Sequence, residues 1–186
     1  MDNMFEDLRE KTIRSIWVFK GNLLNLRLDK VSQSDGRKAS REVVEHPGAA
    51  AIVPVFAEGD VLLVHQWRQP IQKITLEIPA GTLDPGEDPE ECARRELAEE
   101  TGYEATQMHL LASMSLTPGY STEIIHTYLA TGLESVEPGR WKPDDDENLA
   151  MVTMPLSEAV SKCSKGEIHD GKTVAGLLMA WQRRHG

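Results

Sequence analysis

The segment from Asp88 to Gly102 carries a complete set of helix signals and constrains the fold more than any other part of the chain. Asp88 is a good N-cap residue, and Pro89 suits the first helical position, where an N–H would have no intrahelical partner. Strong helix formers follow, and Gly102 is typical of the residue just past a helix end. We therefore expect one well-bounded helix over 89–101.

Short apolar or alternating runs between turn residues predict strands on both sides of this helix. The stretches 49–56 and 61–67 are apolar and are separated by a glycine-containing loop, which predicts a hairpin. Many strands with few helices favour a mixed α/β sandwich. The other expected strands are 16–19, 24–28, 41–45, 74–78, 110–116, 124–130 and 148–154, and the other expected helices are 156–164 and 173–184.

Charge and composition exclude several classes of protein. The 186 residues carry a formal net charge of −10, which repels phosphate backbones and argues against nucleic acid or an anionic membrane as the partner. The two cysteines, Cys92 and Cys163, form no metal-binding or disulfide pattern. The N-terminus lacks the basic and apolar parts of a secretory signal, and no apolar run is long enough to span a membrane. These features predict a cytoplasmic protein.

Three carboxylates share one face of the expected helix. At 100° per residue, Glu96, Glu99 and Glu100 lie within an arc of about 100°. Like charges at this spacing repel, unless a hard divalent cation turns the repulsion into coordination. The alternative is a solvated acidic helix face, which is common in proteins.

A wider pattern around this helix favours the cation. Gly81, Glu87, the Arg95-Glu96-Leu97 triplet, the Glu99-Glu100 pair and Gly102 stand at the fixed positions of the Nudix hydrolase signature, which the segment resembles. The resemblance implies an α/β/α sandwich with a mixed central sheet and an N-terminal antiparallel strand extension. It also implies that Glu96, Glu100 and the carbonyl of Ala80 hold Mg²⁺, for which Mn²⁺ can substitute. Glu99 is a weaker candidate, either as a metal ligand or beside the ligands, and it is also a candidate catalytic group.

The flanking segments resemble the ADP-ribose pyrophosphatase branch of that family. The similarity lies in 66–68 and 76–81 before the signature, in 116–123 after it, and in 166–173 near the C-terminus. It implies metal-dependent hydrolysis of ADP-ribose to AMP and ribose 5-phosphate. The alternatives are a pyrophosphatase for another nucleoside diphosphate sugar, such as GDP-mannose or ADP-glucose, and a non-catalytic ADP-ribose-sensing module.

The same resemblance implies a set of substrate contacts. Arg68, at the end of an apolar strand, is expected to hold the diphosphate, because a guanidinium fork suits phosphate oxygens. Arg41 and Glu42 match a pair that reaches the nucleotide across a dimer interface, and Glu123 matches a substrate contact. For each of these residues a plain surface role is the alternative.

The resemblance implies that a carboxylate on the acidic loop before the last strand acts as general base or as a further metal ligand. Glu147 is the best match to the branch and Asp145 is the second choice. Glu99, on the expected helix, is a further alternative for the base, and a merely solvated acidic loop is the alternative to any role of the loop. The resemblance also implies a homodimer. In this view residues 1–45 form an N-terminal strand region for dimerisation and nucleotide contact, and residues 46–186 form the Nudix hydrolase domain.

Overall fold

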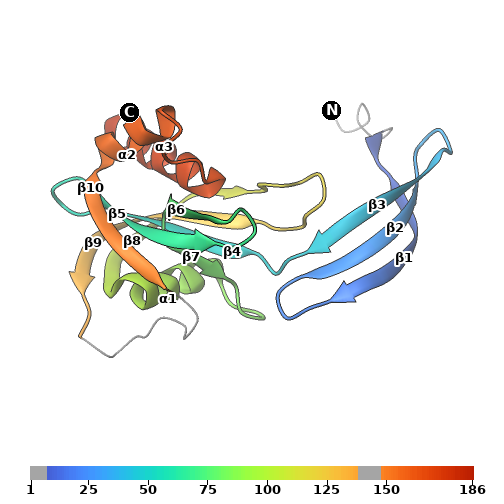
Figure 1. The fold of residues 1–186 in the computed structure, drawn as a ribbon, viewed down its shortest axis with the longest axis horizontal. Coiled ribbons are helices and arrows are strands. Elements are labelled where there is room, and N and C mark those ends of the chain that lie inside the picture. The colour runs from blue at the N-terminus through green and yellow to red at the C-terminus, as the bar shows by residue number, and fades with distance from the viewer. Residues whose placement is uncertain (1–7, 138–147) are drawn as a thin grey trace. The chain divides into compact units, whose positions relative to one another are not determined.

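The computed structural model describes residues 8–137 and 148–186, which form two compact units (Figure 1). The N-terminal unit comprises the chain up to Pro47 together with Thr117–Glu123, and the larger unit comprises Gly48–Leu116 and Ile124–Gly186. The acidic loop that carries Asp145 and Glu147 lies outside the described residues. The division of the chain predicted at residues 45 and 46, with a separate role for each part, stays a prediction.

The N-terminal unit is an antiparallel sheet of three strands in the order β1-β2-β3. Its strands are β1 (Lys11–Lys20), β2 (Asn25–Ser32) and β3 (Lys38–Glu45). The 117–123 segment adds to the end of β3, where the amide of Val44 donates to the carbonyl of Tyr120 at 2.7 Å. The predicted antiparallel strand extension is therefore confirmed.

The larger unit contains two sheets. A mixed sheet has the order β7-β4-β9-β8, in which β4 and β9 are parallel, and an antiparallel sheet has the order β10-β5-β6. The strands are β4 (Ala49–Pro54), β5 (Asp60–Arg68), β6 (Lys73–Glu77), β7 (Ala80–Thr82), β8 (Tyr103–Met114), β9 (Ile125–Ser135) and β10 (Leu149–Pro155).

The predicted hairpin between 49–56 and 61–67 forms only at its loop. Val55 and Val61 make an antiparallel bridge and the amide of Phe56 donates to the carbonyl of Asp60 at 2.9 Å, but beyond this turn β4 and β5 belong to different sheets. Each strand has partners on both edges, β7 and β9 for β4 and β6 and β10 for β5, so neither offers an edge to the other. Every residue of β4 is buried, as expected for a central strand of the sheet.

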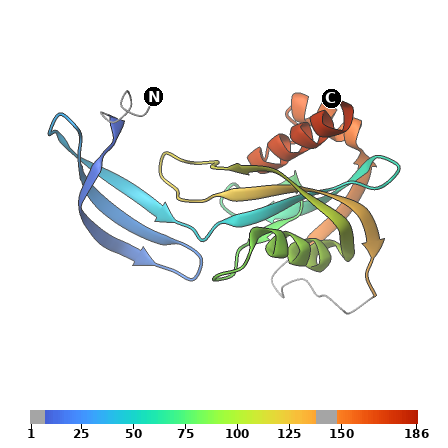
Figure 2. The same ribbon diagram turned by 180° about the vertical axis from the view of Figure 1, so that it is seen from behind.

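Three helices complete the larger unit: α1 (Pro89–Thr101), α2 (Leu156–Ser164) and α3 (Gly171–His185). Helix α1 covers one side of the strands, and α2 and α3 cover the opposite side (Figure 2). This layering confirms the predicted α/β/α sandwich with a mixed sheet. None of the described helices is long and apolar enough to cross a membrane.

The caps predicted for α1 are present. The Asp88 side chain accepts a hydrogen bond from the amide of Glu90, and Gly102 adopts a left-handed conformation with φ of 69°. This turn sends the chain directly into β8, which begins at Tyr103, earlier than the predicted 110–116 strand. The Asp88 cap and the Gly102 turn therefore fix the two ends of α1.

Candidate active site

Packing of α1 decides where its carboxylates lie. Ala93 and Leu97 are fully buried against Ile52 and other residues of the mixed sheet, and they fix the helix by its apolar side. Beside this contact, Glu96 and Glu100 are only 7% and 6% exposed. Burial of charged groups is costly unless they are paired or bind a metal, so a solvated acidic face does not describe these two residues.

Arg95 ties the helix to the loop before it. Its guanidinium donates to both carboxylate oxygens of Glu87, at 2.9 and 3.0 Å, and to Glu99 at 3.0 Å and Glu96 at 2.6 Å. The hydrogen bond from Arg95 lowers the pKa of Glu87 to about 2, with burial opposing and the backbone amide of Asp84 assisting. One arginine thus orients three carboxylates of the signature.

Gly81 lies against the Glu96 carboxylate. A Cβ atom on Gly81 would come within 1.9 Å of the carboxyl carbon and of Oε1 of Glu96. A side chain at this position would displace the Glu96 carboxylate, so the glycine matters through close approach rather than through its backbone angles. Ala80, whose carbonyl is a predicted ligand, directly precedes this contact in β7.

These groups suit a divalent cation. Within residues 8–137 and 148–186, no three His, Cys, Asp or Glu side chains are already gathered as a metal cage. Mg²⁺ does not need one, because it is commonly held by one or two carboxylates with water and substrate phosphates. Two buried carboxylates beside a close backbone approach fit that donor set. Glu96, Glu100 and the Ala80 carbonyl are the groups that would hold the ion.

Arg68 lies in the same unit, at the end of β5. It donates two hydrogen bonds to the carboxylate of Glu77, at 2.8 and 2.6 Å, and its side chain is 40% exposed. Hydrogen bonding to Glu77 raises the pKa of Arg68 against the opposing effect of burial, and the charges of Asp170 and Glu100 add to the rise. The charge of Glu100 therefore acts on Arg68, although less than that of Glu77.

Sequence reasoning missed the groups behind Arg68. Glu77 is 1% exposed and forms ion pairs with both Arg68 and Lys172. Burial tends to raise the pKa of Glu77, but hydrogen bonds from Arg68 and the charge of Lys172 outweigh it and lower the pKa to about 2. The available signal was a charged residue inside an apolar strand, directly before Ile78 and Pro79.

The remaining predicted substrate contacts belong to the N-terminal unit. Arg41 and Glu42 are exposed on β3, and Arg41 pairs with Glu10. Glu123 lies on the 117–123 segment, where its carboxylate is 3.6 Å from Nδ1 of His46. The structure describes this unit by itself, so these three residues stay predicted contacts.

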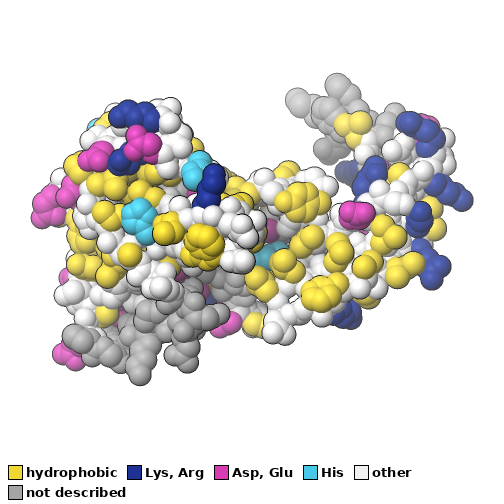
Figure 3. Space-filling model, viewed as in Figure 1, with side chains coloured by type: hydrophobic (Ala, Val, Ile, Leu, Met, Phe, Trp, Pro, Cys, Tyr) yellow, Lys and Arg dark blue, Asp and Glu magenta, His cyan; other side chains and the backbone are white. Residues whose placement is uncertain are grey.

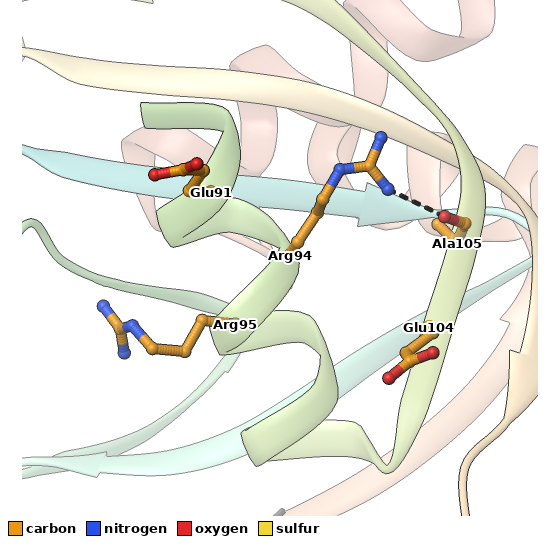
Figure 4. Close-up of a pocket in the computed structure, with 5 residues that line it drawn as sticks. All are labelled: Glu91, Arg94, Arg95, Glu104 and Ala105. Atoms are coloured by element: carbon orange, nitrogen blue, oxygen red, sulfur yellow. Dashed lines mark hydrogen bonds between the residues drawn. The ribbon is translucent and has the colours of Figure 1, made fainter. Parts of the chain in front are cut away.

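A pocket of about 320 Å³ lies between α1 and the start of β8. Arg94 reaches across it to donate to the carbonyl of Ala105 at 2.8 Å, whereas Arg95 points away from β8 (Figure 4). Glu91 and Glu104 complete the lining. None of the predicted metal or substrate residues lines this pocket, but Arg95, which donates to Glu96 and Glu99, does.

The NUDIX domain family model matches residues 45–177, which is more than half of the chain. The chain belongs to the Nudix family. A methanol dehydrogenase activator from Bacillus methanolicus is 42% identical over 95% of this chain and 94% of its own length. An ADP-ribose pyrophosphatase from Bacillus subtilis is 38% identical over 92% of both chains. A GDP-mannose pyrophosphatase from Yersinia enterocolitica is 35% identical over 78% of both.

A solved structure described as an ADP compounds hydrolase superposes with a TM-score of 0.83. It covers 96% of both chains at 23% identity, and this likeness shows the fold alone. The predicted resemblance to the Nudix family and its ADP-ribose pyrophosphatase branch is thus confirmed. The predictions of a Nudix hydrolase and of the Nudix-type fold are confirmed as well. Nudix pyrophosphatases of this branch generally use a divalent metal, and relatives of this chain are named for small nucleotide compounds.

Proposed function

We propose that this Nudix hydrolase cleaves the pyrophosphate bond of ADP-ribose, giving AMP and ribose 5-phosphate, with Mg²⁺ as the metal and Mn²⁺ as a substitute. The observation that carries the proposal is the close approach of Gly81 to Glu96, with Glu100 buried one turn further along α1. The kinship with the pyrophosphatase from Bacillus subtilis supports ADP-ribose as the substrate.

Glu96, Glu100 and the Ala80 carbonyl hold the metal in this proposal. A cation bound there would neutralise phosphate charge and lower the pKa of water. Arg68 binds the diphosphate, and a partly exposed guanidinium is suited to phosphate oxygens. Arg95 keeps Glu87, Glu96 and Glu99 in fixed positions before substrate arrives.

The reaction needs one base. A water oxygen attacks a phosphorus of the diphosphate, the bridging P–O bond breaks, and the proton of the water passes to a carboxylate. Glu147 is the proposed base, although it lies outside the described residues, and Asp145 or Glu99 is the alternative. Replacing Glu147 by glutamine should lower kcat by roughly 10²–10⁴. An unchanged kcat would move the role to one of the other two residues.

The N-terminal unit is proposed to form a homodimer interface and to supply Arg41, Glu42 and Glu123 to the nucleotide. Four consecutive residues of β1, Ile16 to Phe19, are 44–61% exposed. Figure 3 shows apolar side chains gathered on the surface of this unit. Neighbouring strand residues face opposite sides, so apolar groups are uncovered on both, which is typical of a surface that another chain covers. Sedimentation of the purified protein tests this proposal, and a monomer would contradict it.

A cytoplasmic location is proposed from the thiols. Both Cys92 and Cys163 are free, which is usual in a reducing compartment. Fractionation of cells that express the tagged protein tests the location.

Product analysis on a substrate panel tests the proposed activity. The panel contains ADP-ribose, ADP-glucose, GDP-mannose and a dinucleotide, each with Mg²⁺. AMP and ribose 5-phosphate from ADP-ribose, at the highest kcat/KM of the panel, would support the proposal. A higher kcat/KM for GDP-mannose would favour the second candidate, which the relative from Yersinia enterocolitica supports. No turnover of any adenine compound would reject the ADP-ribose assignment.

A further inference from the structure

We infer that Glu77 and Lys172 are positioning residues that hold the Arg68 guanidinium in place for the diphosphate. This inference rests on the proposed function, because it assigns to Arg68 the substrate phosphates. It adds two residues, from β6 and α3, to which the sequence analysis assigns no individual role. Neither residue needs to touch the substrate.

The contact between Arg68 and Glu77 fixes the plane of the guanidinium. Nε and Nη2 of Arg68 donate to the two carboxylate oxygens of Glu77, at 2.8 and 2.6 Å. A paired contact of this kind sets both direction and orientation. Within residues 8–137 and 148–186, the other terminal nitrogen, Nη1, donates no hydrogen bond to the protein. One edge of Arg68 is therefore anchored and the other edge remains for a ligand.

Glu77 is in turn fixed from two further sides. The hydroxyl of Thr75 donates to its Oε1 at 2.5 Å, and the ammonium of Lys172 donates to its Oε2. Lys172 comes from the first turn of α3, 95 residues further along the chain. Thr75, Glu77 and Lys172 are 3%, 1% and 7% exposed, so water does not compete for these bonds.

The end of α3 holds Lys172 in place. Asp170 caps this helix by accepting from the amide of Thr173 at 3.0 Å and from its hydroxyl at 2.6 Å. The same Asp170 oxygen accepts from Nζ of Lys172 at 3.1 Å. The Thr173 hydroxyl also accepts a hydrogen bond from the amide of Ile78, next to Glu77. Helix end and strand end are thus joined at one point.

Charge balance explains why a second cation is present. Arg68 and Lys172 supply two positive charges, and Glu77 and Asp170 supply two negative charges. Without Lys172, Glu77 would depend on Arg68 alone for charge compensation in a buried place, and a phosphate would compete with Glu77 for that arginine. With Lys172 in place, Glu77 keeps a positively charged partner when Arg68 also binds a substrate phosphate. An arginine held in advance also loses less conformational freedom on binding.

The alternative is a purely structural ion pair that joins α3 to the sheet. Such a pair would change stability without acting through Arg68. The two cases differ in a double-mutant cycle, because a positioning residue has no effect on binding once the residue it positions is removed.

The experiment measures the Kd of ADP-ribose by calorimetry in EDTA, so that no hydrolysis occurs. Four proteins are compared: wild type, Lys172→Met, Arg68→Ala and the double variant. Lys172→Arg, which keeps the positive charge, is the rescue control. Circular dichroism checks the fold of each. If Lys172→Met does not fold, the same cycle is made with Thr75→Val, which removes the hydroxyl on Glu77 and little volume.

We expect Lys172→Met to raise the Kd roughly 3- to 30-fold in the wild-type background and to leave it unchanged in the Arg68→Ala background. Lys172→Arg should recover most of the affinity. An unchanged Kd for Lys172→Met, or the same fold-change in both backgrounds, would overturn the inference.

Turnover separates this inference from the proposed function. A wild type that binds ADP-ribose, shows the coupled cycle and releases no AMP with Mg²⁺ would reject the proposed function and support the positioning role. A wild type that hydrolyses ADP-ribose, in a cycle that shows no coupling between Lys172 and Arg68, would support the proposed function and reject the positioning role.

Discussion

Gly81 and Glu96 approach so closely that a methyl group on Gly81 would lie 1.9 Å from the Glu96 carboxyl group. The two residues belong to different elements, β7 and α1, and the contact sets the position of the helix face against the backbone that precedes Gly81. A buried carboxylate beside backbone carbonyls offers the oxygen ligands that a hard cation prefers. The absence of a side chain at Gly81 therefore leaves room for the Glu96 carboxylate where it lies.

Replacing Gly81 by alanine should displace Glu96 and weaken metal binding. A misplacement of about 1 Å at a reacting centre costs on the order of 100-fold in rate, and we expect kcat/KM to fall by about that factor. The Kd of Mn²⁺ from calorimetry should rise as well. Gly171→Ala is the matched control, because its new Cβ would meet Leu116 at 3.9 Å, an ordinary contact. Equal activity of the two variants would contradict the role of the close approach.

Arg95 should matter more for stability than its neighbour Arg94. Arg95 orients Glu87, Glu96 and Glu99 and is 25% exposed at its side chain, whereas Arg94 pairs with Glu90, donates one hydrogen bond to the Ala105 carbonyl and is 42% exposed. Removing one partner of a partly buried charge network costs roughly 1–3 kcal/mol, while an exposed pair contributes less than about 1 kcal/mol. Urea unfolding of Arg95→Met and Arg94→Met checks the order. A larger loss for Arg94→Met would show that the network is not structural.

The fold of the larger unit was visible in the sequence wherever its signals are local. Asp88, Pro89 and Gly102 bound α1 by short-range chemistry, and the structure has all three where the sequence predicts them. The pairing of β4 is not local, because its parallel partner β9 comes from far along the chain and not from the neighbouring strand β5. Two apolar runs joined by a short loop are compatible with a hairpin and also with two strands in different sheets. The sequence therefore does not show that β4 and β5 belong to different sheets.

The candidate site divides in the same way. Helical periodicity placed Glu96, Glu99 and Glu100 on one face, and packing of α1 then buried two of them. The partners of Arg68 were not predictable, since Lys172 joins Glu77 across 95 residues and only the tertiary fold brings them together. Chemistry within one helix is visible in a sequence, and a charge network across three elements is not.

The stability of the larger unit should fall at acid pH through Glu77. The pKa of Glu77 is lowered from its ordinary value near 4.5 to about 2, so its ionised form favours the folded state. This contribution is complete above about pH 4.5 and is lost as the pH falls through 2; it amounts to about 3 kcal/mol at most. Between pH 6 and pH 3, Glu77→Gln should therefore lose less unfolding free energy than wild type does. Equal losses in the two proteins would contradict the assignment.

The two cysteines should differ in reactivity. Burial, together with the charge of Glu87, raises the pKa of the fully buried Cys92 to about 12, and its thiol faces the carbonyls of Gly81 and Thr82. A thiol in that state does not react as a nucleophile near neutral pH. In a timed reaction with a disulfide reagent at pH 8, the Cys163→Ala protein should show no fast thiol until it is unfolded. Rapid labelling of that folded variant would contradict the burial of Cys92.

The buried carboxylates of α1 are the centre of the proposed metal site, and replacing one of them tests that site most directly. The measurement is kcat/KM for AMP release from ADP-ribose, for wild type and for Glu100→Gln, with Mg²⁺ and with EDTA. Glu91→Gln, on the exposed side of the same helix, is the control. We predict that wild type and Glu91→Gln are active only with Mg²⁺, and that Glu100→Gln loses roughly 100-fold or more. Full activity of Glu100→Gln would contradict the proposed metal site.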